Sequence, residues 1–147
     1  MNRSELAEKY FTEGYNCSQA VVLAFSDLVN IDKEELLKLS VPFGGGFGRL
    51  RYICGALSGA GIIIGLLFSN GNNKAEVYNM IQEVSDLFEK ELGSILCRDL
   101  LSNNNLNVEI KGKPEERTNE YYSKRPCPEI VKVAARILDE YIINKRV

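Results

Sequence analysis

Four cysteines are the residues of this chain whose chemistry is most distinctive. They are Cys17, Cys54, Cys97 and Cys127. They stand too far apart for a CxxC pair, so the spacing indicates neither a zinc ribbon nor a thioredoxin-type motif. The chain contains no histidine, which excludes Ser-His and Cys-His catalysis, His-ligated haem and mixed Cys/His zinc sites. Four thiols in a reducing compartment favour redox or metal chemistry over structural disulfides.

Each cysteine is predicted to lie in or beside the first turn of a helix. The clearest cases are Cys17, which follows the capping residue Asn16, and Cys127, which precedes Pro128. A helix N-terminus carries unpaired N–H groups and a partial positive charge, and both favour a thiolate over a thiol. We therefore expect four activated thiols. The alternative is that each cysteine is a small buried apolar residue.

Three of the cysteines also have an arginine close by in the sequence, namely Arg51, Arg98 and Arg125. A guanidinium beside a sulfur stabilises the thiolate in the same way as a helix N-terminus. We expect Arg51 and Arg98, together with Gly55 and Gly59, to help bind a cofactor if the cysteines hold one.

The stretch FGGGFGRLRYICGALSGAG, residues 43–61, is dense in glycine around one of these thiols. It contains no G-x-x-x-x-G-K-[ST] and follows a predicted helix rather than a strand, which argues against a phosphate-binding loop. Gly55 and Gly59 lie four residues apart, as do Gly61 and Gly65, so each pair occupies one helix face. We interpret the glycines as clearance around Cys54 that lets a neighbouring backbone approach, either within the fold or at a dimer seam.

Helical periodicity dominates the rest of the chain, and no useful β-alternation is present. The pattern predicts an all-α fold, a single domain over residues 1–147, in which five to seven helices surround a central apolar helix that contains glycine. The expected elements are a helix that ends near Gly14, a helix after Asn16, the short helix DKEELLKLS, the apolar helix from about Ile53, a helix over 74–92, a short helix capped by Ser94 and a final helix after Cys127.

Residues 102–126 form the one long polar connection, which we expect to be a lid, a partner surface or a solvated loop. Tyr121 and Tyr122, with Lys124 and Arg125, could cover the thiol of Cys127 or could serve only in packing and surface charge.

Charge and hydropathy restrict the partners. The formal net charge is −2 and the signs are interspersed, which predicts no nucleic-acid partner. The apolar run Ile53–Phe68 is shorter than a membrane span needs, so we expect no membrane insertion. The opening residues MNRSELAEKYFTEG are amphipathic rather than a secretory signal, and we expect a cytoplasmic protein.

The segments GYNCSQAV, CGALSG and the late CP, with the isolated Cys97 between them, resemble a four-cysteine redox-active family named for its C_GCAxxG_C_C pattern. The resemblance runs from about Gly14 to about Ile137. The family's label places glycine before cysteine, whereas here Cys54 precedes Gly55. The resemblance implies a small bacterial protein that is redox-active through its four cysteines, with a gene often placed near those of transporters.

Three functions are compatible with these patterns. The first is a redox centre in which Cys17, Cys54, Cys97 and Cys127 converge, by dithiol–disulfide chemistry or electron transfer, and a thiol-based oxidoreductase would be the enzymatic form. The second is an iron–sulfur cluster or a zinc ion held by the same four ligands. The third is a helical homodimeric binding module, with a redox partner or a transporter-linked protein as its target.

Overall fold

The computed structural model describes residues 1–146 and shows an all-α protein, with 69% of the chain in helices. The elements are α1 (Arg3–Thr12), α2 (Cys17–Ala24), the 3₁₀ turn η1 (Ser26–Leu28), α3 (Lys33–Ser40), the 3₁₀ turn η2 (Val41–Phe43), α4 (Gly44–Phe47), α5 (Gly55–Phe68), α6 (Lys74–Leu92), α7 (Cys97–Ser102), α8 (Asn119–Lys124) and α9 (Cys127–Arg146). Within the described residues, β-structure is limited to an isolated bridge between Ile53 and Leu96.

Local capping chemistry places several helix ends. The side chain of Asn16 accepts a hydrogen bond from the backbone N–H of Gln19, and the side chain of Gln19 accepts one from the backbone of Asn16. This reciprocal pair satisfies two donors that a helix start otherwise leaves free. At the C-terminal end of α6, Gly93 terminates the helix with a φ of +92°, a conformation that glycine adopts without strain. The predicted capping box before Cys17 is confirmed.

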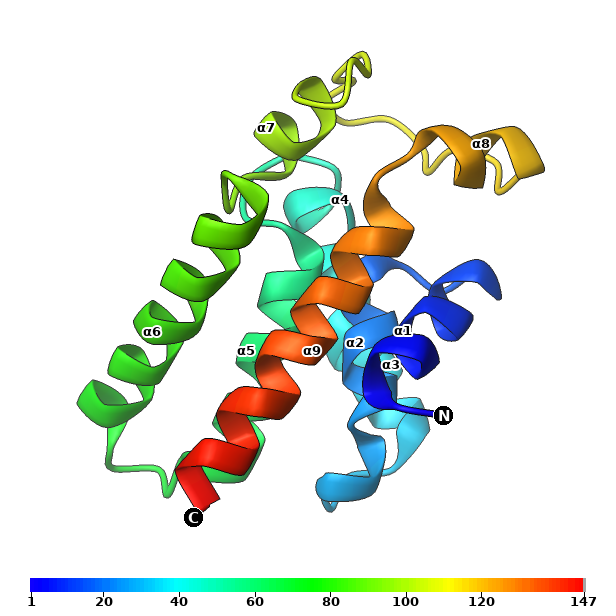
Figure 1. Ribbon diagram of the computed structural model, residues 1–147. Coiled ribbons are helices and arrows are strands. Elements are labelled where there is room, and N and C mark those ends of the chain that lie inside the picture. Colours follow the sequence, from blue (N-terminus) through cyan, green and yellow to red (C-terminus); the bar gives the residue numbers. More distant parts are fainter. Residues whose placement is uncertain (147) are drawn as a thin grey trace.

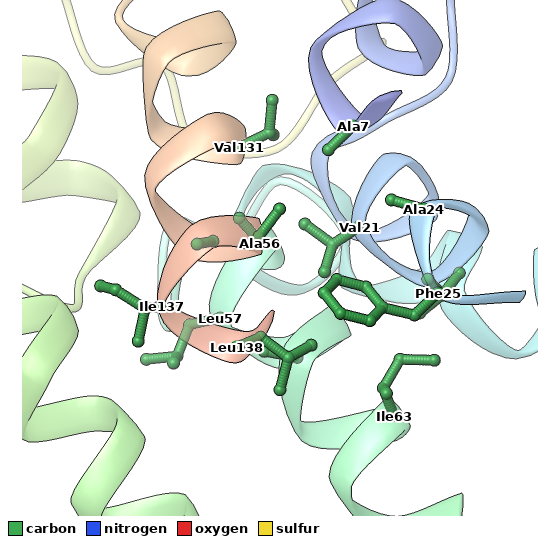
Figure 2. Close-up of a cluster of buried hydrophobic side chains, with 14 of the residues drawn as sticks. Ala7, Val21, Ala24, Phe25, Ala56, Leu57, Ile63, Val131, Ile137 and Leu138 are labelled. Atoms are coloured by element: carbon green, nitrogen blue, oxygen red, sulfur yellow. The ribbon is translucent and has the colours of Figure 1, made fainter. Parts of the chain in front are cut away.

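Helix α5 lies at the centre, as its apolar sequence predicts. It packs against α2, α6 and α9, and α1 covers α2 and α9 from the outside (Figure 1). Figure 2 shows Val21 of α2 and Phe25, the C-cap of that helix, meeting Ile63 of α5 and Leu138 of α9 in one buried cluster. Burial of such side chains contributes about 1.5–3 kcal/mol each relative to exposure. Among residues 1–146, no helix is both long and apolar enough to cross a membrane.

The glycines of α5 allow α2 to approach its backbone. A Cβ atom at Gly55 would lie 2.4 Å from the Cys17 sulfur and 2.6 Å from the Phe43 carbonyl oxygen. A Cβ atom at Gly59 would lie 2.8 Å from the carbonyl oxygen of Ser18. The small-residue face is therefore used inside the fold, and the clearance at Gly55 serves Cys17.

Helices α5 and α9 both begin at the end of the molecule where α4, α7 and α8 lie (Figure 1). The segment before α5 also pairs with the segment before α7: the backbone N–H of Cys54 donates to Ile95, and that of Cys97 donates to the Tyr52 carbonyl oxygen. These two hydrogen bonds, at 2.8 and 2.7 Å, fix two helix starts side by side.

The structure contains more helical segments than predicted, and some of them begin at other residues. Helix α5 begins at Gly55 rather than near Ile53, and α7 begins at Cys97, two residues later than its predicted start at Ile95. Ser94 is not the N-cap of α7; its hydroxyl accepts from the N–H of Leu96. The polar connection contains the short helix α8, whose N-cap Thr118 accepts from the backbone of Tyr121. Short-range side-chain caps of this kind carry no hydrophobic period and are easily missed.

Replacing Gly55 by alanine should destabilise the protein by about 1–3 kcal/mol, because the added methyl group meets a sulfur and a backbone oxygen that have little room to move. Gly65 is the matched control in the same helix. Nothing lies within 4 Å of its Cβ position, so Gly65→Ala should stabilise by about 0.5–1 kcal/mol. Urea unfolding of both variants measures the effect, and equal stabilities would contradict the assignment.

Candidate functional site

All four cysteines line one cavity with a volume of about 70 Å³. Cys54 is buried, and the other three are partly buried. Each thiol is free, so the described structure contains no disulfide. The convergence that the sequence analysis expected of Cys17, Cys54, Cys97 and Cys127 is thus present in the fold, although they come from distant parts of the chain.

Helix starts place these four side chains. Cys17, Cys97 and Cys127 are the first residues of α2, α7 and α9, and Cys54 is the N-cap of α5. The predicted positions in or beside first turns are confirmed. Four helix N-termini consequently converge on one cavity, and each brings a partial positive charge and unpaired N–H groups.

The glycine loop supplies contacts to two of the thiols. The backbone N–H of Gly45 hydrogen-bonds the sulfur of Cys17. A Cβ atom at Gly46 would lie 2.8 Å from the Cβ of Cys97, so only a residue without a side chain fits there. Gly45 and Gly46 also have φ values of +64° and +73°, the left-handed region that glycine tolerates best. The loop therefore lies against both Cys17 and Cys97.

Three arginines line the cavity, and two of them were expected near the cysteines. Arg51 donates from Nη1 to the sulfur of Cys97 at 3.5 Å, although it precedes Cys54 in sequence. Arg125 and Arg117 also line the cavity. Arg98 does not; its side chain is exposed.

Of the two glycines predicted to help bind a cofactor, one lines the cavity and the other does not. Gly55 lines the cavity, whereas Gly59 lies further along α5 against Ser18 and Val21 of α2. Tyr121 lines the cavity beside Cys127, as one of the two interpretations of the tyrosine pair expected.

Sequence reasoning missed Arg117. Its guanidinium donates to the carbonyl oxygens of Phe11 and Tyr15, at 2.9 and 3.0 Å, and lies 4.3 Å from the centre of the Phe11 ring. These partners lie about a hundred residues earlier in the chain, so no local pattern points to them. The only local indication was that Arg117 lies four residues before Tyr121, whose ring its guanidinium contacts.

Burial outweighs the helix N-termini in setting the acidity of three thiols. It raises the pKa of Cys17, against the opposing effect of the Gly45 N–H, and raises the pKa of Cys54 well above its ordinary value. Burial, followed by the neighbouring Cys17, raises the pKa of Cys127 to about 12, and Arg125 only partly offsets this. The expectation of activated thiolates is therefore wrong for these three residues, because a charged sulfur loses more hydration in the cavity than the helix starts return.

The structure also bears on single-ion binding. Within residues 1–146, no three or more Cys, Asp or Glu side chains are grouped closely enough to hold a metal ion. The metal-ligand roles of the four cysteines remain predictions.

The sequence matches a family described as "Putative redox-active protein (C_GCAxxG_C_C)" over residues 15–141. The chain belongs to this family. Membership assigns it a redox role. Comparison with curated proteins and with solved structures finds no match for the chain. The C_GCAxxG_C_C designation orders its central residues Gly-Cys-Ala, whereas this member has Cys54, Gly55 and Ala56. Position 55, where the designation has cysteine, faces the sulfur of Cys17.

The raised thiol pKa values predict that the reduced protein loses stability as the pH rises from about 9 toward 12. Above the ordinary thiol pKa of 9.0, the unfolded chain has released the proton of Cys127 while the folded protein keeps it. Each such thiol lowers the free energy of unfolding by about 1.4 kcal/mol per pH unit in that window.

Urea unfolding between pH 8 and pH 10.5, under reducing conditions, tests this slope. Cys127→Ser is the matched control because serine does not ionise in that range, and its stability should fall less steeply than that of the parent protein. Parallel pH profiles for the two proteins would contradict a raised pKa at Cys127.

Proposed function

We propose that the cysteine cavity is a buried redox centre in which two of the four thiols carry two electrons by cycling between dithiol and disulfide. The observation that carries this proposal is that Cys17, Cys54, Cys97 and Cys127 all line one cavity of about 70 Å³. These residues come from distant parts of the chain, and each stands at the start of a helix. The redox role of the family supports the same conclusion.

Cys97 is the best candidate for the attacking thiol. Its sulfur accepts a hydrogen bond from the guanidinium of Arg51, and a cationic donor binds a thiolate more strongly than a thiol. The thiolate is the species that attacks a disulfide. Burial raises the pKa of Cys54 and Cys127, so these two thiols ionise less readily than an exposed thiol.

Cys17 is the best candidate for the resolving thiol. It lies across the glycine loop from Cys97, with the N–H of Gly45 on its sulfur and the backbone of Gly46 against the Cys97 side chain. Burial is the main cause of the raised pKa of Cys17, and the neighbouring Cys97 adds to it.

The proposed step is a thiol–disulfide exchange with a disulfide substrate as the oxidant. The Cys97 thiolate attacks one sulfur of that substrate, the substrate's S–S bond breaks, and one thiol leaves. Cys17 then attacks the sulfur of Cys97 in the mixed disulfide and releases the second thiol. Two cysteine thiols become one Cys17–Cys97 disulfide, and two electrons and two protons pass to the substrate's sulfurs.

A second candidate is an iron–sulfur cluster with the same four cysteines as ligands. The observation that favours it is the positive charge of the cavity: Arg51 and Arg117 form no ion pair with a carboxylate in residues 1–146, and four helix N-termini add to them. A cluster held by four thiolates is anionic and would be stabilised there. Such a cluster would supply one-electron transfer, with the cysteines as its ligands.

Thiol counting under oxidation separates the two. Reduced protein should show four titratable thiols when denatured. After exchange with a small neutral disulfide and removal of the reagent, it should lose two thiols, with Cys17 joined to Cys97 in the peptide map. Cys54→Ser is the control: it should still lose two. A dithiol reductant should restore the count.

Protein purified without oxygen should meanwhile be colourless and free of stoichiometric iron. Visible absorbance that dithionite bleaches, together with iron and acid-labile sulfide, would reject the dithiol proposal in favour of the cluster. A metal-free protein whose four thiols all resist oxidation in the native state would reject both.

A further inference from the structure

A second cavity, with a volume of about 290 Å³, adjoins the cysteine cavity. Its size is close to that of small-molecule sites in proteins. The two cavities share Asn16, Gly45, Arg51, Arg117, Tyr121 and Arg125. A molecule in the larger cavity would therefore touch the same side chains that surround the thiols.

The larger cavity is lined by four arginines and one carboxylate. The arginines are Arg49, Arg51, Arg117 and Arg125, and the carboxylate is Glu115. Glu115 pairs with Arg125, so its charge is already matched. Of the other three, Arg49 forms a long ion pair with the exposed Glu109, whereas Arg51 and Arg117 pair with no carboxylate in residues 1–146. The lining contains no acidic residue besides Glu115, and the field inside the cavity attracts anions.

Arg49 carries the sharpest sign of a missing partner. Its Nη2 atom is buried and donates no hydrogen bond to any of the described residues. The carboxylate of Glu109 lies 3.7 Å from that atom, beyond hydrogen-bond distance, and the Glu109 side chain is 81% exposed. A buried guanidinium donor without an acceptor is costly, because its hydration is lost and nothing replaces it.

The other two arginines, Arg51 and Arg117, donate to carbonyl and hydroxyl oxygens, and Arg51 also donates to the sulfur of Cys97. Arg51 donates from Nε to the Glu109 carbonyl oxygen at 2.8 Å, and the backbone of Arg51 is in the left-handed region, with φ of +64°. Arg117 donates to two carbonyl oxygens and to the hydroxyl of Tyr122. Their positions are thus fixed by the fold, and no carboxylate in residues 1–146 neutralises either charge.

We propose that this cavity binds the oxyanion group of a small-molecule substrate, a carboxylate or a phosphate, and holds it beside the thiols. Arg49 is the principal ligand residue, since a guanidinium fork matches an oxyanion with two parallel hydrogen bonds. The assignment rests on the proposed function for its substrate class, an acidic low-molecular-weight disulfide. That substrate accepts the two electrons by the exchange described above, and its acidic group sits among the arginines while its S–S bond faces Cys97.

Anion binding can be measured without any redox step. Inorganic phosphate and succinate are titrated into the reduced protein at low ionic strength, by calorimetry. Both should bind, and Arg49→Gln should weaken binding roughly tenfold, because it removes a charge-assisted donor pair. Arg49→Lys should give an intermediate loss, since it keeps the charge but not the fork.

The matched control is Lys113→Gln, which removes one positive charge from an exposed position between two residues that line the cavity. It should change binding by roughly twofold or less. Equal losses in Lys113→Gln and Arg49→Gln would reduce the effect to general charge and overturn the site. If phosphate binds and succinate does not, the substrate's oxyanion group is a phosphate and not a carboxylate.

A pair of disulfide reagents connects the site to the thiols. Dithionitrobenzoate carries carboxylates, and dithiodipyridine is neutral. The parent protein should react faster with the anionic reagent relative to the neutral one, and Arg49→Gln should lose that preference about tenfold while keeping its rate with the neutral reagent. Thermal unfolding of each variant verifies that it is folded.

The outcomes separate the two proposals. Thiols that exchange with the neutral reagent but show no anionic preference, in a protein that binds no phosphate or succinate, would overturn the anion site and leave the redox centre standing. Phosphate binding that depends on Arg49, in a protein whose thiols do not exchange, would support the site and reject the dithiol chemistry.

Discussion

The contact between α2 and α5 sets the geometry on which the cysteine cavity depends. Where α5 begins, Gly55 has no side chain, and the sulfur of Cys17 occupies the space that a Cβ atom would fill. One turn later, Gly59 admits the carbonyl oxygen of Ser18. Since packed interiors tolerate little extra volume, a larger residue at either point would push the two helix starts apart. The close approach of Cys17 to the start of α5 therefore depends on glycine at positions 55 and 59.

Two opposing electrostatic effects meet in the cavity. Burial favours neutral thiols and raises the pKa of Cys17, Cys54 and Cys127, while helix N-termini and guanidinium groups favour anions. For these three thiols burial is the larger effect. The arginines meet the reverse problem, because they keep their charge when buried and need something negative nearby. While the thiols are neutral, the guanidinium groups of Arg51 and Arg117 lack an anionic partner among residues 1–146, which is electrostatically unfavourable. The arrangement becomes favourable when a thiolate forms or an anion binds there.

Local sequence signals predicted the capped start of α2 and placed the starts of α5 and α7 within two residues, but they missed α8 and could not identify tertiary partners. The box formed by Asn16 and Gln19 is encoded within four residues, so the start of α2 could be predicted directly. The partner of Arg51 could not: proximity in sequence suggests Cys54, whereas the β-bridge between Ile53 and Leu96 brings Arg51 to Cys97. Arg117 is positioned by carbonyl groups of α1 and the following turn, which no periodicity connects to it. Thiol acidity was mispredicted for the same reason, because burial is a property of the whole fold.

The order of Cys54 and Gly55 shows what the cavity requires. A thiol carried at position 55, as in the C_GCAxxG_C_C designation, would project from a Cβ atom only 2.4 Å from the Cys17 sulfur, which is closer than unbonded atoms can approach. This chain places the thiol one residue earlier, at the N-cap of α5, where the sulfur still lines the cavity. A shift of one residue at this helix start therefore keeps a thiol on the cavity. With cysteine at 54 and glycine at 55, the chain keeps four sulfurs around one cavity and leaves the space beside Gly55 to the sulfur of Cys17. The order of glycine and cysteine differs from the designation, but the number of thiols at the helix starts is the same.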